Sequence, residues 1–165
     1  MGNVTSIGKL AFSSCSSLIS VTNGDVATIG ESAFSYCTSL TSIDIPAGVT
    51  SISKSAFSSC TSLTSIDIPN GVTSIGECAF SYCTSLTSID IPASVTSIDK
   101  GTFYGCSSLK DLYCHATIPP NLYAIYPYES FSYYKEKTIL HVPARCGTKY
   151  KSSDWGNFFK TIKEM

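Results

Sequence analysis

The chain has 165 residues and a net charge of −1, and only 14% of its residues are charged, against roughly 25% in an ordinary soluble domain. So small a charge does not favour nucleic acid or an anionic membrane as a partner. We find neither an apolar run approaching the roughly 20 residues of a membrane-spanning helix nor a recognisable signal peptide. We therefore expect no nucleic-acid partner and no membrane span.

A repeat of 23 residues organises most of the chain. Residues 40–62 return almost unchanged from Leu63 and again from Leu86. The repeat gives a partial coil before Leu18, four full coils to Ser108, an irregular coil to about residue 137, and a terminal segment. Leucine, phenylalanine and cysteine each recur once per repeat: Leu18, Leu40, Leu63, Leu86 and Leu109; Phe12, Phe34, Phe57, Phe80 and Phe103; Cys15, Cys37, Cys60, Cys83 and Cys106.

Each coil contains two short extended segments and a compact return. The alternation of residues 42–45 predicts a strand with its isoleucines inward and Asp44 outward, and Pro46 ends that strand. Residues 49–52 form a second extended piece, and residues 54–60 predict a short helical or 3₁₀ return. A lone coil buries too little apolar surface to offset the entropy of ordering it, so the coils must stack. The sequence therefore predicts a solenoid.

The pattern L-x-x-I-x-I-P, then V-x-x-I, then A-F-x-x-C in residues 40–60 resembles the BspA-like class of bacterial leucine-rich repeats. The tail, beginning with residues 118–120, is similar to the C-terminal end of such proteins from Bacteroides-type bacteria. The resemblance implies an exported or cell-surface protein that binds other macromolecules through a right-handed repeat stack. One departure is that Gly48, Gly71 and Ser94 replace the asparagine of many leucine-rich repeats, so no asparagine ladder is expected.

The fold class we expect is an α/β repeat solenoid: a leucine-rich repeat with 23-residue coils, short parallel strands, and a C-terminal cap with one short helix. We assign residues 1–137 to the solenoid, of which residues 109–137 form the irregular last coil, and residues 138–165 to the cap.

The cap helix is predicted to begin at Ser153 or Asp154, which is a fair N-cap, and to end at Met165. It should lie over the end of the solenoid as a hydrophobic lid. Its apolar stripe, at positions i, i+3, i+4 and i+7, consists of Trp155, Phe158, Phe159 and Ile162.

The two ends of the chain differ in charge. Residues 1–108 carry a net charge of −4 and residues 109–165 carry +3. Opposite charges at the two ends could favour head-to-tail self-association. A simpler explanation of the charge difference is that the C-terminal helix is basic. The chain also opens in mid-coil at residues 3–8, which is expected of a fragment, or of a short form with an exposed edge prone to pairing.

Threonines and aspartates recur at strand positions of three successive coils. Stacking would place the aspartates about 5 Å apart, where neighbouring carboxylates repel by only about 0.8 kcal/mol in water. They form either a solvated polar face or a shallow binding surface for a basic or hydroxyl-rich partner. One carboxylate per strand makes a poor calcium cage, so no metal is expected. The candidate binding residues are Thr41, Asp44, Thr64, Asp67, Thr87 and Asp90.

Residues 113–150 hold seven of the ten tyrosines. The phenylalanine spacing grows to 28 between Phe103 and Phe131, an insertion of five residues. This segment is either a cap that closes the last coil or an exposed aromatic loop that stacks on sugars or anchors a protein partner. Its candidate binding residues are Tyr113, Tyr126 and Tyr128.

The cysteine series should point into the core, where free thiols pack as small hydrophobic groups. An in-register stack of five cannot pair completely, which favours reduced thiols over disulfides. Zinc is not expected, because no C-x₂-C pair with matching histidines occurs. His141 and Cys146 lack an orienting third group at a recognisable spacing. We therefore expect no catalytic residues and no cofactor.

These observations predict a non-enzymatic cell-surface or secreted binding module for protein or glycan partners, acting in adhesion or interaction. The alternative is a structural spacer or self-assembling scaffold without a ligand of its own. Near-identical coils favour the alternative slightly, because a specific binding face usually varies between repeats. Here the variation appears only at Lys110, Asp111 and Tyr113.

Overall fold

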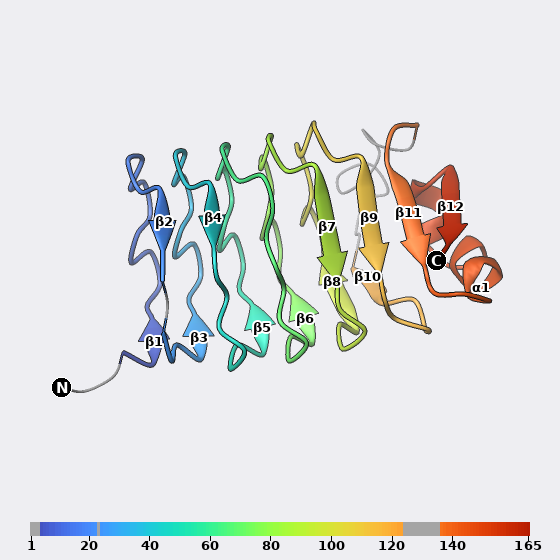
Figure 1. Cartoon of the computed structure of the whole chain (residues 1–165), viewed down its shortest axis with the longest axis horizontal. Helices are drawn as coiled ribbons and strands as arrows, with labels where there is room; N and C mark the ends of the chain where they lie inside the picture. The colour runs from blue at the N-terminus through green and yellow to red at the C-terminus, as the bar shows by residue number, and fades with distance from the viewer. Residues whose placement is uncertain (1–3, 23, 124–135) are drawn as a thin grey trace.

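A computed structural model describes residues 4–22, 24–123 and 136–165. Within these ranges the chain winds in coils that stack along one long axis, from β1 at one end to β12 at the other (Figure 1). The predicted leucine-rich-repeat solenoid of 23-residue coils with short parallel strands is confirmed. None of the helices within these ranges is long and apolar enough to cross a bilayer.

Strands from successive coils form two columns, and the pairings within both are parallel. The first column contains β2 (Ser20–Val21), β4 (Ser42–Ile43), β7 (Ser88–Ile91), β9 (Asp111–Cys114), β11 (Ile139–Val142) and β12 (Thr161–Glu164). The second contains β1 (Ser6–Ile7), β3 (Thr28–Ile29), β5 (Ser51–Ile52), β6 (Ser74–Ile75), β8 (Ser97–Asp99) and β10 (Asn121–Tyr123). Strands of the first column run down the page in Figure 1, and those of the second run up.

The return segment consists of tight turns, not the helical or 3₁₀ segment predicted for residues 54–60. Its backbone makes i→i+3 hydrogen bonds of 3.1 to 3.3 Å. Ser55 and Ser59, however, have φ angles of 52° and 62°, which a right-handed helix does not allow. Their N–H groups donate to the Glu77 and Ser81 carbonyls of the next coil. Hydrogen bonding between coils has therefore replaced bonding along a helix.

Phenylalanines and cysteines form two columns inside the solenoid. Successive phenylalanine rings lie 5.2 to 5.9 Å apart and within 8° of parallel, from Phe12 to Phe103. From Cys37 onward, each cysteine of the series is buried and donates its S–H to the carbonyl of a phenylalanine in the preceding coil, at 3.1 to 3.2 Å. Cys15, in the first described coil, is exposed, and all eight cysteines are free. The expected core position thus holds for four of the five.

The cap differs from the single helix predicted up to Met165, and that prediction is wrong. It contains two short helices, α1 (Gly147–Lys151) and α2 (Trp155–Phe158), followed by strand β12. Asp154 makes no side-chain capping hydrogen bond, and Phe159 has extended backbone angles that end α2. Beyond it the chain pairs with the edge of β11, which satisfies backbone groups that a solvent-exposed helical turn would leave to water.

Buried hydrogen bonds hold the cap to the last coil. The Trp155 indole donates to the Pro120 carbonyl at 2.9 Å, and the Tyr150 hydroxyl donates to the Ala116 carbonyl at 2.8 Å. Both aromatic side chains are almost fully buried. Because β11 also pairs with β9, the first strand column continues from the irregular coil into the cap. The division at residue 137 stays a prediction.

Candidate functional site

The outward-facing side chains of the first strand column form a continuous polar surface, which we call the strand face. Pairing register places one residue from each of six successive segments in a single row across it. At roughly 4.8 Å per strand, this row extends over about 24 Å. It changes from three carboxylates to an aromatic, an imidazole and an amine. Its members in order are Asp44, Asp67, Asp90, Tyr113, His141 and Lys163.

A rigid aromatic pair occupies the middle of the row. The Tyr113 ring stacks on the His141 imidazole, with centroids 4.4 Å apart and planes 17° from parallel. His141 Nε2 is hydrogen-bonded to Asp111 Oδ1 at 2.7 Å. The hydrogen bond to Asp111 fixes the His141 ring, and stacking on His141 fixes the Tyr113 ring. A partner that contacts Tyr113 would therefore not have to offset the conformational entropy of ordering that side chain.

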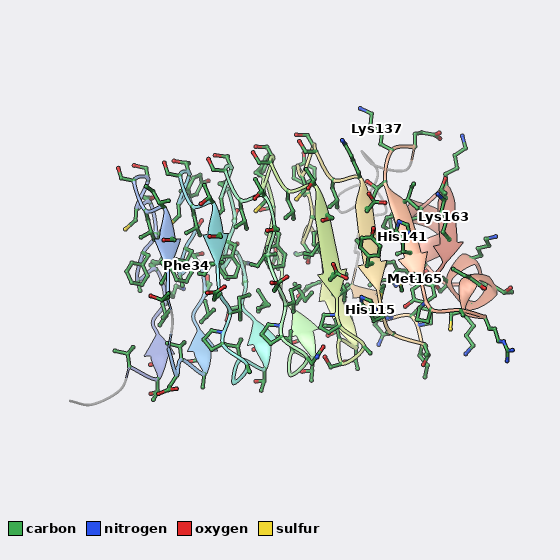
Figure 2. All side chains as sticks on the ribbon, viewed as in Figure 1. Phe34, His115, Lys137, His141, Lys163 and Met165 are labelled. Carbon is green, nitrogen blue, oxygen red and sulfur yellow. The ribbon has the colours of Figure 1, made fainter. Side chains whose placement is uncertain are left out.

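A second imidazole–carboxylate pair lies beside the first. His115 Nε2 and Asp90 Oδ1 are 2.9 Å apart, and both side chains are exposed. Figure 2 shows His115, His141 and Lys163 on the C-terminal half of the molecule. This part of the strand face therefore offers hydrogen-bond donors, acceptors, both signs of charge and an aromatic surface.

The structure brings the predicted strand residues onto one face. Thr41, Thr64 and Thr87 are exposed, and their backbone groups form part of the ladder, since Thr64 N–H and Thr87 N–H donate to the preceding threonine carbonyl at 3.5 and 3.4 Å. The other two candidates, Tyr126 and Tyr128, lie outside the described residues.

Sequence reasoning missed the contacts of His141 and His115. The clue for His141 was the five-residue insertion, because Tyr113 and His141 are 28 residues apart, the same lengthened spacing that separates Phe103 from Phe131. Adding the insertion to the repeat length would have paired Tyr113 with His141. No comparable clue exists for His115, whose contact with Asp90 runs diagonally between strands.

Sequence reasoning also missed three exposed tyrosines in the turn segments: Tyr36, Tyr82 and Tyr104. We call this set the tyrosine ridge. The alternation of F-S-Y-C with F-S-S-C in successive coils marks two of its members in the sequence.

A pocket of about 310 Å³ lies between residues 93–96 and residues 116–121. Alanine, valine, threonine, isoleucine, proline and asparagine line it, and none of these side chains is acidic or basic. Within the described ranges, no three or more metal-ligating side chains gather closely enough to hold an ion.

Similar solved structures include two proteins that are at least 30% identical to this chain. A leucine rich cell surface protein from Faecalibacterium prausnitzii A2-165 is 39% identical over 69% of this chain and 30% of its own, with a TM-score of 0.66. A leucine-rich repeat protein from Bacteroides ovatus ATCC 8483 is 30% identical over 98% of this chain and 40% of its own, with a TM-score of 0.70. This chain thus spans less than half the length of either relative.

A leucine-rich repeat protein of T. pallidum is 25% identical over 98% of this chain and 67% of its own, with a TM-score of 0.70. No curated protein matches the chain. The family described as "BspA type Leucine rich repeat region" matches in six copies, over residues 2–110 and 27–145. The repeat residues, the fold and this match agree, and the chain belongs to the BspA-type leucine-rich repeat family.

Proposed function

We propose that the chain is a non-enzymatic binding module of a bacterial cell-surface or secreted protein, and that its strand face binds a protein partner in adhesion. The family supports an interaction or scaffold role, and one relative is named a cell surface protein. The observation that carries the proposal is the row from Asp44 to Lys163, which combines a charge gradient with a fixed aromatic pair.

Each part of the row has a distinct physical role in binding. Exposed charges contribute little affinity singly, yet they speed association and select partners of complementary charge. Tyr113 is half-buried and held by His141, which makes it a low-entropy anchor of the kind that dominates interfaces. A fitting partner carries basic groups opposite the three aspartates, a recess for Tyr113, and an acceptor near Lys163.

Removing the three carboxylates should weaken binding of any protein captured from an array of extracellular proteins by about tenfold, since three exposed charge contacts at roughly 0.5 kcal/mol each sum to about 1.5 kcal/mol. The variant is Asp44→Asn/Asp67→Asn/Asp90→Asn, and surface plasmon resonance at two salt concentrations measures the change. The loss should be larger at low salt.

The matched control, Asp25→Asn/Glu31→Gln/Glu77→Gln, removes the same charge from segments outside the first strand column. Its affinity should stay within about twofold of the unmodified chain, a difference near 0.4 kcal/mol. Equal weakening by both variants would indicate a bulk charge effect and contradict the proposed site.

A scaffold or spacer role is the second candidate, because Thr41, Thr64 and Thr87 are identical in three coils. Such uniformity suits regular stacking better than recognition of an irregular surface. Failure of the folded chain to bind any arrayed protein, together with a mass that rises with concentration, would favour the scaffold. The predicted head-to-tail association would then become the leading hypothesis.

A further inference from the structure

The tyrosine ridge exposes aromatic rings along the turn side of the solenoid. Tyr36, Tyr82 and Tyr104 are 58%, 49% and 43% exposed. Tyr36 and Tyr82 occupy the same position two coils apart, a separation of roughly 9.6 Å along the axis, and Ser59 holds that position in the coil between them. Tyr104 lies beside Tyr82 in the following coil.

The backbone at this coil position is left-handed whichever residue occupies it. Ser14, Tyr36, Ser59 and Tyr82 have φ angles of 63°, 61°, 62° and 58°, and Gly105 follows at 77°. A non-glycine residue in this left-handed region costs roughly 1–2 kcal/mol, which glycine would avoid. The cost is offset by hydrogen bonds between coils, since Tyr36 N–H and Tyr82 N–H donate to the Ser58 and Tyr104 carbonyls of the next coil at 2.8 and 2.6 Å. Serine satisfies the same backbone in other coils, so neither the backbone nor the core requires an exposed tyrosine ring at these two positions.

The Tyr82 ring is also held in place. It lies over Gly105, where an added Cβ would come within 2.6 Å of the ring. The Tyr104 ring meets it at 89°, with centroids 5.2 Å apart, and the hydrogen bond that the Tyr82 hydroxyl donates to Tyr104 raises the pKa of Tyr82. The ring is thus preorganised while half of it remains exposed, which suits stacking against a flat ligand.

The surroundings of the ridge are neutral and rich in hydroxyl groups. Thr61 and Thr84 donate their hydroxyls to carbonyls of the preceding coil at 3.3 and 3.4 Å, which leaves their oxygen lone pairs as acceptors. A partner held by charge is therefore disfavoured here. No Asp, Glu, Lys or Arg occurs in the segments that carry the ridge and the adjacent turns, residues 32–43, 55–66, 78–89 and 101–109.

We propose that the tyrosine ridge binds a neutral, linear polysaccharide that runs along the solenoid axis. The C–H face of one sugar would stack on Tyr36 and that of a later sugar on Tyr82, with sugar hydroxyls bonding to the neighbouring serines and threonines. A regular polymer can repeat at a fixed multiple of the coil spacing, whereas the surface of a folded protein has no such period. This site is independent of the strand face.

Affinity electrophoresis in native gels containing hydroxyethyl cellulose, galactomannan or arabinoxylan tests the proposal, with hyaluronan as an anionic comparison. At least one neutral polysaccharide should retard the chain, and hyaluronan should not. Tyr36→Ser/Tyr82→Ser/Tyr104→Ser should weaken retardation at least tenfold. The chain itself supplies these replacements, because serine occupies the equivalent positions of other coils with the same backbone, as at Ser59.

Two further variants separate stacking from other effects. Tyr36→Phe/Tyr82→Phe keeps both rings and should retain most of the retardation, and the Asp44→Asn/Asp67→Asn/Asp90→Asn variant should be unaffected. Retardation by no neutral polysaccharide, retardation by hyaluronan alone, or equal retardation of the folded serine variant and the unmodified chain would each overturn the proposal. So would a captured protein whose binding requires the ridge tyrosines.

Discussion

Replacing Phe57 by alanine should lower the free energy of unfolding by about 3–5 kcal/mol, the range for a fully buried phenylalanine. Phe57 is 0% exposed and stacks between Phe34 and Phe80, each with a ring centroid 5.6 Å away. Coils contact mainly their neighbours, so a cavity in a central coil weakens two interfaces at once. Guanidinium unfolding followed by circular dichroism measures the change.

Phe12 provides the matched control, because it is only partly buried and stacks on Phe34 from the first described coil. Phe12→Ala should cost roughly 1–2 kcal/mol, since less apolar area is lost. Equal losses in the two variants, or a loss under about 1 kcal/mol for Phe57→Ala, would contradict a continuous phenylalanine column as the source of stability.

Raising the pH from 9 to 11 should destabilise the fold strongly. Burial raises the pKa of Cys60 to about 12, with a further contribution from Cys37, and burial raises the pKa of Cys106 to about 12 as well. Both thiols must stay protonated to donate to the Phe34 and Phe80 carbonyls. In the unfolded chain a cysteine ionises near pH 8.5–9, roughly three units lower.

The free energy of unfolding falls as the pH rises because the folded state holds these protons to a higher pH than the unfolded state. Below about pH 9 both states keep these protons, so the stability is fully present; above it only the unfolded state loses them. Stability then falls by about 1.4 kcal/mol per pH unit for each thiol until the folded pKa near 12. The two thiols together remove about 5 kcal/mol by pH 11.

Guanidinium midpoints measured from pH 8 to pH 11 test this slope against Cys60→Ala/Cys106→Ala. The alanine variant should start less stable and lose less on alkalinisation, because every other titrating group, including the buried Cys83 thiol, is common to both proteins. Parallel pH profiles would show that Cys60 and Cys106 do not control alkaline unfolding.

The repeat allowed most of the solenoid to be predicted, because a side chain at a given coil position meets its own counterpart in the next coil. The repeat length alone predicts that Asp44, Asp67 and Asp90 lie in one row, and their strand pairing confirms it. The backbone conformation of the turn segments was harder to predict, because a helix and a series of turns can both bury Ala56, Phe57 and Cys60 at this spacing. Bonds between coils decide in favour of turns.

The cap shows where local pattern fails. Residues 155–162 fit a helical stripe, and the aromatic members are buried as that stripe requires. Ile162 nevertheless lies on a strand paired with Leu140, because β11 provides an edge that only the assembled fold contains. The tyrosine ridge was missed for another reason: Tyr36 and Tyr82 resemble ordinary variation between serine and tyrosine until the exposure of their rings is known.

The most direct test of the proposed strand-face interaction is photo-cross-linking to a protein recovered from the array. A photoreactive residue would replace either Thr64 on the strand face or Thr73 beside the second strand column, two exposed threonines of the same coil. The account predicts a covalent adduct from position 64 and none from position 73. An adduct from position 73 alone, or equal yields from both positions, would contradict it.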